Sequence, residues 1–96
     1  MSSVSVEISW SGSSPTASPD PVPVDTKKGQ DQVHWHSTED FIITLETVPP
    51  VTINANGSGT NYVANSGKFT TPGKVPYTIA SASGGPVVDP EIDVQG

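Results

Sequence analysis

The clearest structural signal in this chain is the segment VHWHSTEDFIITL, residues 33–45. Before its polar centre, Val33 and Trp35 alternate with two histidines, and after it Phe41 begins a second alternation of inward and outward positions. A period of two is typical of β-strands that have one buried face. The segment therefore predicts two strands joined by a turn at residues 37–40.

The same period of two recurs on both sides of this segment. It is found in residues 4–10, around Val22 and Val24, and in residues 75–79 and 92–94. Turn-forming residues separate these stretches, and no stretch of 11 residues has helical periodicity. We therefore expect about seven or eight short strands in an all-β, antiparallel Greek-key β-sandwich, which forms a single domain over residues 1–96.

Three segments between these strands are expected to be loops that form a variable surface: Ser11–Pro23, Pro49–Gly67 and Ser81–Asp89. The first is rich in proline, and we interpret it as an ordered crossover loop that runs into an edge strand near Val22, where proline is tolerated. In the second, Asn56-Gly57 predicts a type I′ turn. Another extended piece is expected to begin at Phe69.

Composition and charge exclude several classes of protein. Hydrophobic residues make up only 32% of the chain, and no apolar run approaches the roughly 20 residues that span a bilayer. Four lysines and ten acidic residues give a net charge of −6, which argues against nucleic acid and anionic membranes as partners. The chain has no cysteine, so disulfides and thiolate ligands are excluded, and Met1 is its only sulfur-containing residue.

The localisation stays open at this stage. The first ten residues, MSSVSVEISW, lack the basic and apolar regions of a signal peptide. A protein that remains inside the cell and an exported protein whose leader is missing from this chain are both compatible with that observation.

The chain is similar to the cupredoxin-like domains in a series of motifs that runs over residues 20–95. The motif residues are Gly29, Val33 and Trp35, then Phe41, then Gly67, Phe69, Pro72, Gly73, Tyr77 and Ile79, and finally Asp89, Pro90, Ile92 and Val94. This resemblance implies a cupredoxin-like sandwich. An immunoglobulin-like sandwich is the alternative, because Trp35 also resembles the buried tryptophan of strand C in that fold.

The resemblance implies a copper site whose ligands are absent here. A blue-copper centre uses a thiolate, two imidazoles and usually a thioether. Ser81 stands where the family has cysteine, and the position of the family's first histidine falls near Asp40 or Phe41. The loop Ser83–Val88 contains neither histidine nor methionine. The resemblance thus implies a cupredoxin-like domain without type-1 copper.

Two other groups of residues could bind a metal ion. His34 and His36 are two positions apart on a predicted strand, so they point to the same face and could share one divalent ion, with Glu39 or Asp40 as a further ligand. The simpler interpretation is that both are solvent-facing residues. Asp89, Glu91 and Asp93 could similarly form a weak calcium site, although a charged face that protects a sheet edge explains them better.

These observations favour a non-catalytic binding or structural module. The chain has no G-x-S-x-G elbow and no phosphate-binding glycine loop before a helix, so we expect neither enzyme activity nor a cofactor. Two alternatives remain: copper binding through His34 and His36, and a carbohydrate-binding or adhesion domain. The partner would be a protein or a glycan, and the oligomeric state stays open.

Trp10 and Trp35 are in phase with the inward residues of their strands, so we expect them to face the core rather than a sugar.

Overall fold

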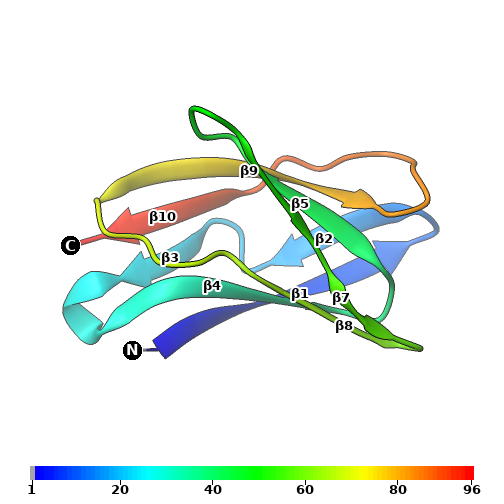
Figure 1. The fold of residues 1–96 in the computed structure, drawn as a ribbon, viewed down its shortest axis with the longest axis horizontal. Helices are drawn as coiled ribbons and strands as arrows, with labels where there is room; N and C mark the ends of the chain where they lie inside the picture. Colours follow the sequence, from blue (N-terminus) through cyan, green and yellow to red (C-terminus); the bar gives the residue numbers. More distant parts are fainter. Residues whose placement is uncertain (1) are drawn as a thin grey trace.

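The computed structural model describes residues 2–96 as two five-stranded sheets packed face to face (Figure 1). The first, here called the β1 sheet, has the order β2 (Ser14–Ser18), β1 (Ser2–Ser11), β4 (Gln30–Ser37), β8 (Asn61–Asn65), β7 (Asn56–Ser58). The second, the β9 sheet, has the order β3 (Val22–Asp25), β10 (Glu91–Gln95), β9 (Gly73–Ser81), β5 (Phe41–Leu45), β6 (Val51–Asn54). One turn of 3-10 helix, η1 (Thr26–Lys28), connects β3 to β4. The expected all-β sandwich is confirmed.

Both sheets are mixed, so the expectation of purely antiparallel strands is wrong at two places. Strand β1 runs parallel to β4, and β10 runs parallel to β3. The cause is the path of the chain: after the β1–β2 hairpin it crosses to the other sheet as β3 and returns beside β1 as β4. Parallel neighbours need a crossover of this kind, whereas hairpins give antiparallel ones.

The core lies between the sheets and consists of the inward residues of the alternating strands. Trp35 on β4 is fully buried, as the sequence predicts, and its ring meets that of Tyr77 edge-on, with centroids 5.2 Å apart and planes inclined at 61°. Other fully buried apolar residues are Val6, Pro15, Val22, Val24, Val33, Phe41, Ile43, Ile79 and Ile92. Apolar burial from both sheets therefore holds the two layers together.

Two of the predicted loops contain strands. Ser11–Pro23 includes β2, an edge strand that accommodates Pro15 because its outer side needs no donor. Pro49–Gly67 includes β6, β7 and β8, and the tight turn lies at Gly59, which has a φ of +64°, rather than at Asn56-Gly57. Gly57 lies within β7, where a Cβ would collide with the carbonyl oxygen of Asn61. Phe69 belongs to the connection before β9, so the extended piece expected there is not part of a strand.

Within residues 2–96, the structure contains no helix that is long and apolar enough to cross a membrane.

Candidate functional site

The two histidines lie on the outer face of the β1 sheet. Strand β4 places His34 opposite Ser5 and His36 opposite Glu7 of β1. The His36 ring is engaged on both sides, because its Nδ1 lies 2.8 Å from Oε2 of Glu7 and its Nε2 lies 3.0 Å from Oδ1 of Asn61. The protonated ring can donate to both oxygens.

This arrangement raises the pKa of His36 above its usual 6.5, first through the hydrogen bond to Glu7. A metal ion would have to displace that proton and one of these two partners. Glu39 and Asp40 do not supply the further ligand, since residues 2–96 contain no group of three His, Asp or Glu side chains close enough to hold a metal ion. Met1 lies outside the described residues. Metal binding by His34 and His36 stays a prediction.

The carboxylates near the C-terminus have separate surroundings. Glu91 forms an ion pair with Lys74, at 3.8 Å, and Asp93 accepts a hydrogen bond from Nε2 of Gln95. Asp89 precedes β10 and interacts with Glu46 instead. The pKa of Glu46 is raised mainly by desolvation and secondly by repulsion from the negative charge of Asp89. Because β10 lies between β3 and β9, these residues do not protect a sheet edge, and that interpretation is wrong.

The tryptophans do not provide an exposed aromatic platform. Trp35 is fully buried, and Trp10 is partly buried against the core. The indole Nε1 of Trp10 donates to Oγ of Ser37 at 2.7 Å, which fixes its ring. A sugar site of the stacking type would need other residues.

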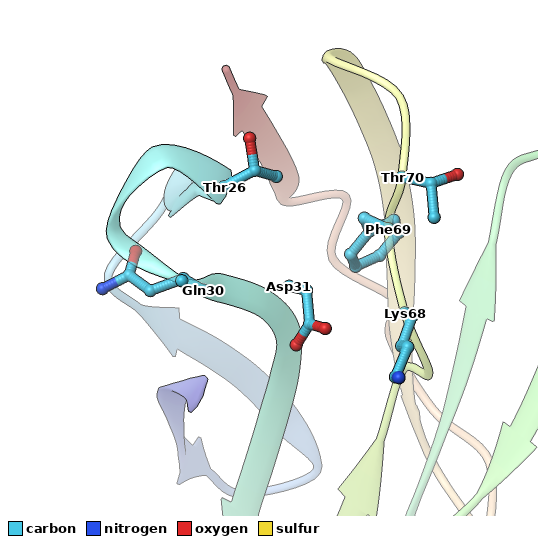
Figure 2. Close-up of a pocket in the computed structure, with 7 residues that line it drawn as sticks. Thr26, Gln30, Asp31, Lys68, Phe69 and Thr70 are labelled. Atoms are coloured by element: carbon cyan, nitrogen blue, oxygen red, sulfur yellow. The ribbon is translucent and has the colours of Figure 1, made fainter. Parts of the chain in front are cut away.

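A cavity that sequence reasoning missed lies at the end of the sandwich that carries η1 and the C-terminus (Figure 1). It has a volume of about 430 Å³ and lies between the start of β4 and the connection from β8 to β9 (Figure 2). Its lining residues are Thr26, Gly29, Gln30, Asp31, Lys68, Phe69 and Thr70. This volume lies within the range of small-molecule sites.

Asp31 is the unusual residue of this cavity. It has the same inward phase on β4 as Val33 and Trp35, and it is only 8% exposed. Its Oδ1 is buried and has no hydrogen-bond partner. Buried polar atoms nearly always have partners, and a buried charge without one is costly. Asp31 is therefore the residue at this end of the molecule that most requires an explanation.

Phe69 forms the wall opposite Asp31. Its backbone N–H donates to the carbonyl oxygen of Asp31 at 2.7 Å, which ties the β8–β9 connection to β4. The half-buried ring extends towards the Asp31 carboxylate across the cavity (Figure 2). The cavity thus combines a carboxylate and an aromatic ring.

The remaining polar groups do not neutralise Asp31. Oε1 of Gln30 accepts from the backbone N–H of Asp25, and the Thr26 hydroxyl donates to the carbonyl oxygen of Gln95. Lys68 is exposed, and among residues 2–96 no ion pair joins it to Asp31. The sequence offered one signal of this site, namely an acidic residue in phase with buried apolar residues. The contact with Phe69 could be found only in the fold.

A second cavity, of about 330 Å³, lies at the opposite end of β4. Glu39, Asp40, Ser81, Ala82 and Ser83 line it. The hydroxyls of Ser81 and Ser83 are 2.9 Å apart, and Ser81 pairs with Phe41 across β9 and β5.

Comparison with known proteins assigns the chain to no family, because no family model, no curated protein and no solved structure matches it.

Proposed function

We propose that this chain is a non-catalytic binding module and that the cavity beside Asp31 is its binding site. The observation that carries the proposal is the buried Oδ1 of Asp31, which has no partner and belongs to a carboxylate that lines a cavity of ligand size. A group with this deficit gains most from a ligand, because binding replaces the interactions that burial removed.

The scaffold that we propose is cupredoxin-like. Two features support it over the immunoglobulin-like alternative. The two parallel strand pairs differ from the antiparallel sheets of immunoglobulin domains. In addition, Asp40 and Ser81, which stand near two of the family's copper-ligand positions, line the same cavity. Their oxygens replace the nitrogen and sulfur donors that type-1 copper requires.

The binding proposal can be tested by NMR on the full chain labelled with ¹⁵N. The probes are n-butylamine, n-butanol, sodium butyrate and phenol, each added to millimolar concentration. We expect at least one of them to shift the backbone amide signals of Asp31, Phe69 and Thr70 more than those elsewhere. Shifts confined to other surfaces, or none from any probe, would contradict the proposal.

A matched pair of variants shows whether the cavity itself is responsible. Thr70→Trp places a bulky ring on its rim and should weaken the response. Thr38→Trp introduces the same ring beyond the other end of β4, where the native residue is also exposed, and should leave the response unchanged. Equal effects of the two variants would count against the cavity.

Copper binding through His34 and His36 is the second candidate. The observation in its favour is that strand β4 places both imidazoles on the same outer face of the β1 sheet, opposite Ser5 and Glu7 of β1. Titration with Cu(II) should then give a pale spectrum of nitrogen and oxygen ligation, and binding should fade as the imidazoles become protonated at low pH. Replacement of both histidines by alanine should abolish it. Binding that survives this replacement would exclude the histidine site.

A further inference from the structure

We infer that the cavity beside Asp31 binds an alkyl chain that ends in a protonated nitrogen, such as a lysine or arginine side chain of a partner. This inference rests on the proposed function, because it assigns a ligand class to the same cavity. Three properties of the cavity support it: the charge at its base, the ring in its wall and the distribution of positive charge around it.

The carboxylate of Asp31 determines the sign of the ligand. A buried carboxylate is stabilised by a cation or by hydrogen-bond donors, and Oδ1 receives neither from residues 2–96. An ammonium or guanidinium group supplies both at once. The net charge of −6 favours the approach of a cation to the molecule as a whole.

Phe69 determines the kind of cation. The face of an aromatic ring attracts an organic cation and also packs against the methylene groups that carry it. The ring and the carboxylate lie on opposite sides of the cavity (Figure 2). A volume of about 430 Å³ holds a butyl chain with its charged end.

A bare metal ion fits the cavity less well. Asp31 is the only acidic residue that lines it, and no cluster of three potential ligands occurs among residues 2–96. Calcium ions take six to eight oxygen ligands, several of them usually carboxylates. An organic cation needs one carboxylate and an apolar wall, which this cavity provides.

Lys68 determines how many charges the ligand can carry. It is exposed at the rim of the cavity and repels a second positive group near the entrance. A side chain with a single charge, attached to a neutral backbone, therefore suits the cavity better than a free diamine. Lys68 also competes electrostatically with any bound cation.

The test compares probes of equal length and different charge by NMR titration of the full chain. n-Butylammonium and n-butylguanidinium should shift the amide signals of Asp31 and Phe69, and n-butanol and butyrate should bind at least about tenfold more weakly. Acetyl-lysine methylamide represents a peptide side chain and putrescine a free diamine. We expect the lysine derivative to bind more tightly than putrescine. Tighter binding of putrescine would mean that the cation site serves free amines rather than side chains of a partner.

Variants identify the residues responsible. Asp31→Asn keeps the size of the side chain and should weaken n-butylammonium binding at least about tenfold. Phe69→Leu should weaken it about threefold, and Lys68→Gln should strengthen it about twofold. Lys74→Gln removes a charge elsewhere and should have no such effect, because Lys74 is paired with Glu91.

The outcomes separate this inference from the proposed function. If butanol or butyrate shifts the cavity signals and n-butylammonium does not, the cation assignment is overturned and the cavity remains the binding site. If no probe shifts them, both fail. Unchanged n-butylammonium affinity in Asp31→Asn would overturn the inference even where binding occurs.

Discussion

Strand β4 carries a buried polar side chain near each end, and the surroundings of the two differ. Near its C-terminal end, Ser37 is 1% exposed, and its hydroxyl oxygen accepts from Nε1 of Trp10 at 2.7 Å and from the backbone N–H of Glu39 at 3.0 Å. Near its N-terminal end, Asp31 is 8% exposed and its Oδ1 has no partner. Both side chains point inward, in phase with Val33 and Trp35.

The difference separates a structural polar group from a binding one. Hydrogen bonds within the chain satisfy Ser37, so it contributes to the stability of the fold and has little left to offer a ligand. Asp31 is more strongly polar and less well satisfied, and it lies beside a cavity. Residues that serve binding are commonly held at some cost in stability. Substitutions at both residues, and in the core between them, test this contrast.

Trp35→Ala should have the largest effect on stability. Trp35 lies on β4 between the two polar residues, it is fully buried and its ring packs on Tyr77. Loss of the indole should lower the free energy of unfolding by about 3–5 kcal/mol. A domain of this size has about 5–15 kcal/mol in total, so denaturant-induced unfolding will detect the change readily.

His36→Ala is the control for this substitution. It lies on the same strand with its side chain on the outer face, where removal should change the free energy of unfolding little. Similar losses in the two variants would mean that the inward and outward faces of β4 have been exchanged, as a register shift of one residue would do.

Ser37→Ala should have the next largest effect. The substitution removes the acceptor of the Trp10 indole and leaves that partly buried donor without its partner. A loss of about 1–3 kcal/mol is expected in the same unfolding measurement. Ser5→Ala, at an exposed position on β1, is the matched control and should be nearly neutral. If Ser37→Ala leaves the free energy of unfolding unchanged, the hydrogen bonds of Ser37 do not stabilise the fold, and its contrast with Asp31 fails.

The sequence could predict features that depend on residues close together in the chain, namely the positions of strands and the side chains that face the core. Alternation in residues 33–45 located β4 and β5 and the burial of Trp35, because the two faces of a strand follow from its period. It could not predict that β1 lies parallel to β4, since alternation does not encode the neighbouring strand. Strands with proline, such as β2, or with asparagine and glycine, such as β7, carry weak local signals.

The candidate site was harder to predict for the same reason. Asp31 and Phe69 are distant in the sequence, and only the folded chain joins them through a backbone hydrogen bond of 2.7 Å. The sequence showed that His34 and His36 share a face, because they are close in sequence. It could not predict the hydrogen-bond partners of His36, because Glu7 and Asn61 belong to neighbouring strands.

Asp31→Asn should raise stability rather than lower it. An amide is less costly to bury without a partner than a carboxylate, so the free energy of unfolding should increase by about 0.5–2 kcal/mol. Thermal unfolding at neutral pH measures this change. Asp40→Asn, at an exposed position in the β4–β5 turn, removes the same charge and should leave the midpoint nearly unchanged. A clear loss of stability in Asp31→Asn would indicate that the carboxylate is satisfied, as Ser37 is.

The smallest effect is expected outside the core, at the exposed pair of Glu7 and His36, where pairing should alter titration more than stability. The hydrogen bond to Glu7 raises the pKa of His36 above 6.5 in the folded state. The stabilisation from this pair is therefore fully present below about pH 6.5 and is lost as the pH rises through the folded-state pKa. NMR titration of the His36 ring should show a lower pKa in Glu7→Gln, whereas Glu39→Gln should leave it unchanged. If Glu7→Gln leaves the His36 pKa where it was, the 2.8 Å contact does not hold the proton in solution, and His36 becomes free to bind a metal ion with His34.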